Sequence, residues 1–257
     1  MKKTTVSWMV LAALFWCLPE AMADVTLKGT SSGKGIGQLA DGESLTYIKG
    51  LRMRSDSAGG RSTIIDAERG RMILLNHKKK QAEVTDTRDI SKQLEKISGE
   101  GIQASLKSTG RTRQMLGETV EEYQVTIRIP ISPAPDQSVV MVMSGPAWIA
   151  PDSPARRDFG QFYLAAAEKG LFFGDPQAAK AQPGPAKAMT ELYRRMAEAG
   201  VPYSMEMQVK FEGEGMLAAM MSRMASSSFQ NTINEVSVGP LSDDLFEIPA
   251  GYKVKNR

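Results

Sequence analysis

The sequence predicts a mainly β protein of the α+β class, built around an antiparallel sheet. From residue 43 onward, short runs of strand-forming residues alternate with turn residues at even spacing, which is typical of an antiparallel meander. The second half adds two helical segments, 153–169 and 185–199, which can cover only part of such a sheet. All-β folds of this length commonly form one domain, so we expect residues 24–257 to form a single domain.

Residues 1–23 have the pattern of a cleavable export signal. A basic MKK is followed by an apolar run that ends at Pro19, and Ala21-Met22-Ala23 resembles a cleavage site. The apolar run is shorter than the roughly 20 residues that cross a bilayer, so we do not expect an integral membrane protein. The one cysteine, Cys17, lies inside this signal, and an exported chain without disulfides suits the bacterial periplasm.

The charge balance argues against a nucleic-acid-binding protein. The formal net charge is +3, and loss of Lys2, Lys3 and Glu20 with the signal leaves the chain nearly balanced. Proteins that bind nucleic acid usually concentrate a basic excess on one face.

The first half is expected to form a series of hairpins. Its predicted strands are 43–50, 51–56, 61–66, 71–76 and 81–86. Gly70 supplies the positive φ angle that a tight connection needs. His77, the only histidine, lies beside three lysines in LLNHKKKQAEV, at the next predicted turn. We interpret this cluster as a solvated hairpin tip, because an anion site would need nearby arginines or a glycine-rich helix start.

A helix is predicted at Thr87–Ser98, where Ile90, Leu94 and Ile97 recur on one face. Strands then follow at 102–108, 111–117, 122–131 and 139–143. In the third of these, alternation places one set of apolar side chains on a common face: Tyr123, Val125, Ile127, Ile129 and Ile131.

The middle of the chain is expected to be helical. Ser153 is a plausible N-cap with Pro154 at the first helical position, and the second helix is expected to start near Pro185 and to stop at Gly200. Residues 171–184 are rich in proline, glycine and alanine, which favours a mobile loop or lid.

The last part returns to strands. In YSMEMQVKF, one face is predicted to carry Tyr203, Met205, Met207, Val209 and Phe211. A helix in EGMLAAMMSRMAS and a strand at 229–238 follow, and Pro249 and Gly251 are expected to end any regular element near the C-terminus.

The residues predict no enzyme and no cofactor. Ser-His or Cys-His catalysis needs a base beside the nucleophile, and the chain after residue 23 offers no cysteine and one histidine, which lies in the presumed hairpin tip. A histidine or cysteine zinc site is excluded, because such sites need three or four ligands. Asp243-Asp244 is too sparse for calcium or magnesium, and SGKGIG lacks the flanking strand and helix of a phosphate loop. The sequence does not decide whether two carboxylates that come together only on folding could act as a general acid and base.

Methionine is the unusual feature of the composition, with 16 in the chain. Met216, Met220 and Met224 would form one stripe on a helix, and thioethers select copper(I). Methionine also fills irregular apolar space, and we favour that interpretation over a copper site.

Five stretches resemble a family of bacterial exported proteins whose fold is similar to that of the LolA/LolB lipoprotein carriers: YIKGLRMRSD, STIIDAERGRMILLNHKKK, MLGETVEEYQVTI, ELYRRMAEAGVPYSMEMQV and LSDDLFEIPAGYKV. Together they run from about residue 45 to 254, and LFEIPAGYK is the most distinctive piece. Val120 is a departure from the resemblance, because members of such a family often carry cysteine in this glycine-led segment. The resemblance implies a strongly curved antiparallel sheet that forms an incomplete β-barrel, is covered by helices and leaves an apolar cavity.

We therefore expect a non-enzymatic periplasmic carrier or sensor that binds a lipid or lipoprotein acyl chain. The expected cavity lining is Tyr203, Met205, Met207, Val209 and Phe211, with Tyr123, Val125, Ile127 and Ile129 opposite. Two alternatives are an envelope scaffold that binds a protein partner and no small ligand, and a copper(I)-binding protein.

Overall fold

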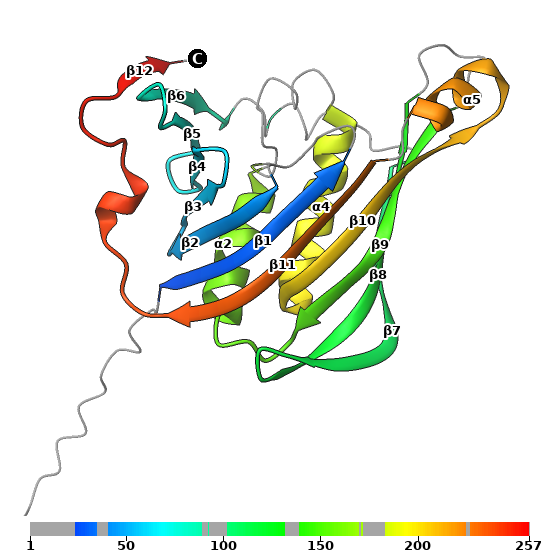
Figure 1. The fold of residues 1–257 in the computed structure, drawn as a ribbon, viewed down its shortest axis with the longest axis horizontal. Coiled ribbons are helices and arrows are strands. Elements are labelled where there is room, and N and C mark those ends of the chain that lie inside the picture. Colours follow the sequence, from blue (N-terminus) through cyan, green and yellow to red (C-terminus); the bar gives the residue numbers. More distant parts are fainter. Residues whose placement is uncertain are drawn as a thin grey trace, which may run out of the picture.

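The structure is a computed structural model that describes residues 24–34, 41–88, 92, 102–131, 139–169, 171, 183–224 and 227–256. Its strands form one twelve-stranded sheet in the order β12-β6-β5-β4-β3-β2-β1-β11-β10-β9-β8-β7. Neighbouring strands are antiparallel, except that β12 runs parallel to β6. The sheet bends so strongly that β4–β6 are seen nearly end-on in Figure 1, while β1 and β11 cross the view. These features confirm the predicted mainly β fold with a curved, incompletely closed sheet.

The strands are β1 (Val25–Lys34), β2 (Gly42–Lys49), β3 (Arg52–Ser57), β4 (Arg61–Asp66), β5 (Arg71–Asn76), β6 (Gln81–Asp86), β7 (Gln103–Met115), β8 (Glu118–Pro130), β9 (Val139–Ala150), β10 (Val201–Gly213), β11 (Ser227–Val238) and β12 (Lys253–Asn256). Among the described residues, the helices with full bounds are α2 (Arg156–Glu168), α4 (Pro183–Ala199), α5 (Gly215–Met224) and the short 3-10 helix η1 (Asp243–Phe246).

The five strands predicted between residues 43 and 86 are confirmed as β2 to β6. β4 and β5 bury apolar residues on both faces: Ile65 and Met72 belong to one core cluster, and Ile64, Ile73 and Leu75 belong to another. Gly70 adopts a φ of 63° in the turn before β5. Two strands, β1 and β12, were not predicted. β1 starts with Val25 and Leu27 on the buried face but continues with glycine and serine, so its alternation of apolar residues stops early.

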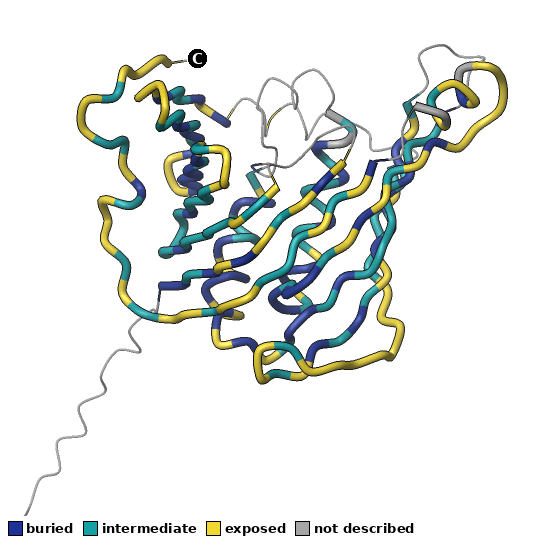
Figure 2. The backbone as a smooth tube through the Cα atoms, in the orientation of Figure 1, coloured by how far each residue is buried: buried dark blue, intermediate teal, exposed yellow. Residues whose placement is uncertain are grey.

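Helices α2 and α4 lie side by side against the concave face of the sheet (Figure 1). Tyr163 of α2 stacks on Tyr193 of α4 with ring centroids 5.7 Å apart, which holds the two helices together. Phe159 and Phe162 of α2 pack against residues of β1 to β5. Under α4, Leu192 and its neighbours pack against β8 to β10. Figure 2 shows the result, with buried residues along the covered part of the sheet and exposed ones along β7.

The first helix of the middle section begins later than predicted. Ser153 was expected to be the N-cap, but Ala155 holds that position and makes no side-chain capping bond. Instead, the Ser153 hydroxyl accepts a hydrogen bond from the Ala155 backbone N–H at 3.2 Å, in a turn that precedes the helix. The second helix ends as predicted, because Gly200 follows Ala199 with a φ of 150°.

The convex face of β4–β6 is covered by the C-terminal segment. Phe246 of η1 packs against Ile64, Ile73 and Leu75, with Leu245, Ile248 and Tyr252 around it. After this segment the chain forms β12 beside β6, although Pro249 and Gly251 were expected to end regular structure here. The sequence could not predict β12, because its four residues are all exposed and show no apolar alternation.

Several predictions lie outside the described residues. They are the export signal at 1–23, nearly all of the helix at 87–98, and nearly all of the loop at 171–184. Among the helices of the described part, none is long and apolar enough to cross a membrane.

Candidate functional site

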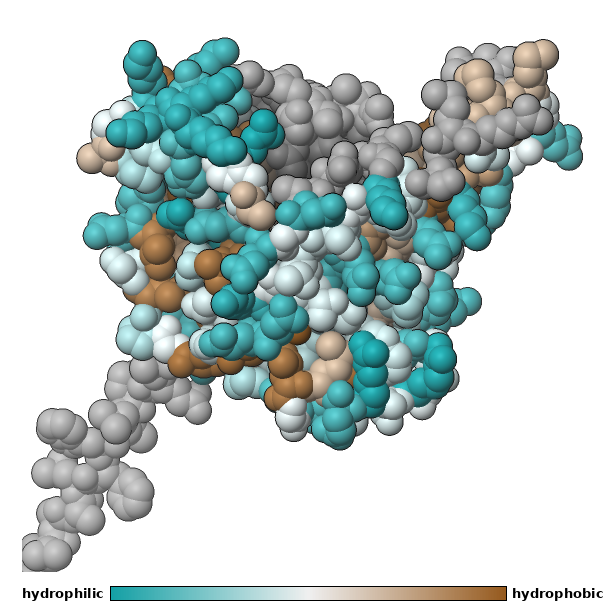
Figure 3. All heavy atoms as spheres, viewed as in Figure 1, coloured by the Kyte–Doolittle hydropathy of each residue, from teal (hydrophilic) through white to brown (hydrophobic). Residues whose placement is uncertain are grey.

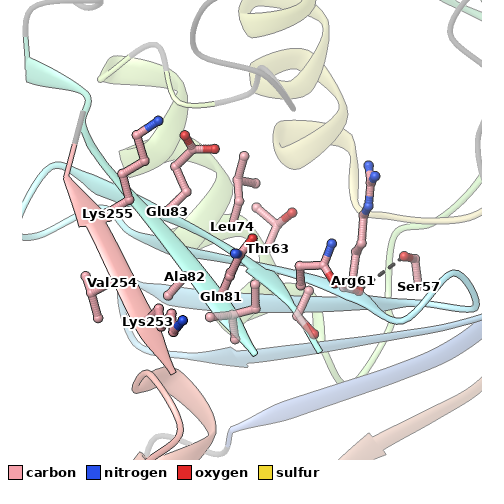
Figure 4. A pocket seen from close by; sticks show the side chains of 13 residues that line it. Ser57, Arg61, Thr63, Leu74, Gln81, Ala82, Glu83, Lys253, Val254 and Lys255 are labelled. Carbon is pink, nitrogen blue, oxygen red and sulfur yellow. Dashed lines mark hydrogen bonds between the residues drawn. The ribbon is translucent and has the colours of Figure 1, made fainter. Parts of the chain in front are cut away.

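A hollow of about 810 Å³ lies at the edge of the sheet, between the tips of β3 to β6 and the C-terminal strand β12 (Figure 4). We refer to it as the edge hollow. Its lining residues are Ser57, Arg61, Ser62, Thr63, Leu74, Leu75, Asn76, Gln81, Ala82, Glu83, Lys253, Val254 and Lys255. Its volume falls in the range of roughly 300–1,000 Å³ that small-molecule sites occupy.

Strand register brings these residues together. One row across the sheet pairs Thr63 with Leu74, Leu74 with Glu83, and Glu83 with Lys255. The adjacent row on the same face contains Arg61, Asn76, Gln81 and Lys253. In Figure 4, Arg61, Leu74, Glu83 and Lys255 rise from the same side of the sheet, toward the helices. These two rows supply eight of the lining residues. The intervening row, whose side chains point to the opposite face, supplies four more: Ser62, Leu75, Ala82 and Val254.

The edge hollow continues from the apolar core on the concave face. Leu74 lines the edge hollow and also packs against the core cluster beneath α2. Two residues further along the same faces of β4 and β5 lie Ile65 and Met72, which are buried at 4% and 2% exposure. The edge hollow therefore meets the apolar core at Leu74, while the other lining residues of that row, Thr63, Glu83 and Lys255, are polar.

The edge hollow carries an excess of positive charge. Arg61, Lys253 and Lys255 line it, and Glu83 is the one carboxylate among its lining residues. All three cations are exposed, and none of them forms an ion pair with a residue in the described ranges. Figure 3 shows mainly hydrophilic side chains at the corner of the molecule where β12 lies.

One wall of the edge hollow is the C-terminal strand. β12 pairs with β6 over four residues, and the backbone N–H of Lys253 donates to the Lys80 carbonyl oxygen at 2.9 Å. Just before β12, the Tyr252 hydroxyl oxygen lies 2.7 Å from Nδ1 of His77. The position of Lys253 and Lys255 therefore depends on contacts between the C-terminus and the turn between β5 and β6.

His77 is a link in a hydrogen-bond chain on the convex side of the sheet. Its hairpin was predicted correctly, but the side chain is not a free, solvated tip residue: Nε2 lies 2.5 Å from the Ser62 hydroxyl and Nδ1 contacts Tyr252. A serine and a histidine at this distance could in principle form a nucleophile and its base. Ser62 lines the edge hollow but is only 2% exposed, and its hydroxyl is occupied by the contact with His77. We interpret this series of hydrogen bonds from Ser62 through His77 to Tyr252 as structural.

The predicted lining residues lie in packed clusters elsewhere on the concave face. Val125, Ile127, Ile129 and Met207 pack with α4, and Tyr123 and Met205 are partly buried around them. Phe211 and Val209 pack near α5. The two sets were expected to face each other, but β8 and β10 flank β9 and present them on the same face of one sheet. None of these residues lines the edge hollow, and their role as cavity lining stays a prediction.

Tyr203, the remaining predicted lining residue, is fully buried in the core beneath α2. Its hydroxyl donates to the Ser153 hydroxyl at 3.0 Å, and burial raises the pKa of Tyr203 to about 12. A phenol with this partner is satisfied within the core, so it is placed to hold the chain before α2 against β10.

The methionine stripe lies on α5. Met216 is 89% exposed and Met220 is 51% exposed, whereas the side chain of Met224 lies outside the described residues. Within the described part of the chain, no group of three histidine, cysteine, aspartate or glutamate residues could hold a metal ion. Copper(I) binding by methionine stays a prediction.

Sequence reasoning missed the edge hollow. The cations that line it are Arg61, Lys253 and Lys255, not the three lysines that follow His77. No short stretch of the sequence could indicate the edge hollow, because it forms only where β12 pairs with β6.

No protein-family model matches the sequence, and no curated protein matches it. Two solved structures of PNGF-II, in different crystal forms, are similar with TM-scores of 0.36 and 0.37 and 10% sequence identity. The similarity covers 91% of this chain but only 31% and 32% of those chains, so this chain spans about a third of their length.

Proposed function

We propose that the protein is a non-enzymatic carrier or sensor of the bacterial envelope that binds a lipid or lipoprotein acyl chain on the concave side of its sheet. The observation that carries this proposal is the edge hollow of about 810 Å³, which meets the apolar core at Leu74. An acyl chain that enters from the edge would lie against Leu74 and bury apolar surface, which contributes about 0.8 kcal/mol per CH₂.

The cellular location and the family belong to the same proposal. The export pattern of residues 1–23 and the absence of cysteine after it support a periplasmic protein. The resemblance of LFEIPAGYK and four other stretches to carriers of the LolA/LolB type supports acyl-chain binding. The open sheet with helices on its concave face is compatible with that resemblance.

Two measurements test the proposal. Native mass spectrometry of protein released gently from the periplasm should detect a bound lipid, and purified protein should take up a fluorescent fatty acid. Thr63→Trp should weaken uptake at least about tenfold, because the indole would occupy the edge hollow that Thr63 lines. The matched control is Thr112→Trp on the exposed edge strand β7, which should leave uptake unchanged. Protein that carries no lipid and takes up no fatty acid would contradict the proposal.

A second candidate is an envelope scaffold that binds a protein partner and no small ligand. One observation favours it: Val125, Ile127 and Ile129, which were expected to face a ligand, are at most 1% exposed and pack against the protein itself. A protein without fatty-acid uptake that still cross-links to one envelope protein would support this alternative.

A further inference from the structure

We infer that the edge hollow is built for an anionic amphiphile, with Arg61, Lys253 and Lys255 binding the carboxylate or phosphate of its headgroup. This inference rests on the proposed function and specifies its ligand class. It adds that the C-terminal strand supplies two of the three cations, so that strand is part of the binding site.

The cations lie on two walls of the edge hollow. Arg61 is on β4, and Lys253 and Lys255 are on β12, with β5 and β6 between them. Neighbouring strands lie about 4.8 Å apart, so three intervals place the two walls about 14 Å apart at the backbone. Long lysine and arginine side chains on both walls can converge on one headgroup across this distance.

The polar and apolar parts of the edge hollow are arranged for an amphiphile. Leu74 lies in the inner row, next to the core, with Lys255 at the far end of that row on β12. Arg61 and Lys253 lie in the outer row, toward the hairpin tips. A ligand with its chain on Leu74 would therefore place its headgroup toward the outer cations. Because three cations face one carboxylate, a negative headgroup is favoured over a neutral one.

The contact between His77 and Tyr252 positions the cationic wall. β12 contains only four residues, all exposed, so it buries little apolar surface of its own. The strand is held by the parallel ladder to β6, by the bond from Lys253 N–H to the Lys80 carbonyl, and by Tyr252 against His77. Tyr252 is a positioning residue in this scheme, because it contacts the turn and not the ligand.

The test compares a pyrene-labelled fatty acid with its methyl ester, using the full mature chain at low salt. Wild-type protein should bind the acid about three- to tenfold more tightly than the ester, the size that two or three exposed charge contacts supply. The double variant Lys253→Ala/Lys255→Ala should lose this preference while still binding the ester. Lys253→Arg/Lys255→Arg should retain the preference, and so should the matched control Lys28→Ala/Lys210→Ala on exposed positions of β1 and β10.

The possible outcomes separate the two proposals. Equal binding of acid and ester, unchanged by the lysine substitutions, would overturn the inference and leave acyl-chain binding intact. Binding of neither probe would overturn the proposed function itself. Inorganic phosphate should displace the acid far less effectively than unlabelled fatty acid does, because it lacks the chain; equal displacement would show a site for free anions and overturn the headgroup assignment.

Discussion

The Tyr252 hydroxyl lies 2.7 Å from Nδ1 of His77, although the two residues are 175 positions apart in the sequence. The two rings also meet edge to face, with centroids 6.0 Å apart. This pair fixes the end of the chain to the turn between β5 and β6 and so places β12 beside β6. Together with the ladder to β6 and the bond from Lys253 to Lys80, this contact at the convex side positions a wall of the edge hollow.

Removing this hydroxyl should loosen the C-terminal strand. We expect Tyr252→Phe to lower the free energy of unfolding by about 0.5–1.5 kcal/mol, the net contribution of one hydrogen bond, as measured by urea denaturation. Limited proteolysis should also cleave the last residues faster. Tyr47→Phe is the control, because Tyr47 packs in the same cluster without a hydroxyl bond in the described structure. Equal stability of wild type and Tyr252→Phe would show that the contact contributes nothing.

Local patterns predicted the fold well where strands alternate apolar and polar residues. In β8, Val125, Ile127 and Ile129 are buried on one face, as their spacing predicts. Alternation of apolar and polar residues could not predict β12, whose residues Lys253–Asn256 are all exposed. Its formation depends on Tyr252 and on the bond to Lys80, which are long-range contacts that a local pattern cannot contain.

The glycine at position 145 permits a close approach of two strands. A Cβ built on Gly145 of β9 would lie 1.9 Å from the backbone carbonyl oxygen of Glu206 in β10. Since a backbone atom cannot move aside cheaply, we expect Gly145→Ala to lower the free energy of unfolding by about 1–3 kcal/mol or more in urea titrations. Gly239→Ala, where a Cβ meets nothing within 4 Å, should change it by less than about 0.5 kcal/mol. Similar stability of both variants would refute the close approach.

Helix α4 should be anchored mainly by its buried stripe. Leu192 is 1% exposed in the cluster beneath α4, so Leu192→Ala should cost about 2–5 kcal/mol of unfolding free energy through lost burial and the cavity left behind. Met216→Ala removes a side chain that is 89% exposed and should cost less than about 0.5 kcal/mol. Thermal or urea unfolding measures both. A tolerant Leu192→Ala variant would mean that the cluster is loosely packed, as an open acyl-chain cavity would require.

The candidate site was much less predictable than the fold. Periodicity identified Tyr203 and Met207 as inward-facing, and both are fully buried. Periodicity cannot distinguish a packed core residue from a cavity wall, however, because both face inward. The edge hollow arises where β4 with Arg61 and β12 with Lys255, far apart in the sequence, belong to the same edge of one sheet with β5 and β6 between them, and only the strand order reveals that arrangement.

The hairpin of β7 and β8 holds a buried carboxylate. Glu122 is 3% exposed, and its Oε2 accepts hydrogen bonds from the Thr109 hydroxyl at 2.7 Å and from Nε of Arg111 at 2.6 Å. The Thr109 bond, followed by Arg111, lowers the pKa of Glu122 below its ordinary value of 4.5, despite the opposing effect of burial. The folded protein therefore favours the ionised form of this group more than the unfolded chain does.

This preference predicts how stability changes with pH. Because the folded pKa of Glu122 is lowered, its contribution is complete above pH 4.5 and is lost as the pH falls from there through the folded pKa. Glu122→Gln should lower the free energy of unfolding by about 1 kcal/mol at pH 7, since bonds to a neutral amide are weaker than bonds to a carboxylate. Urea titrations at pH 7, 5 and 3 should show this difference shrinking in acid. Glu43→Gln, at an exposed position, should differ from wild type at none of these pH values. A Glu122→Gln deficit that is the same at pH 3 as at pH 7 would show that packing, not charge, accounts for the effect.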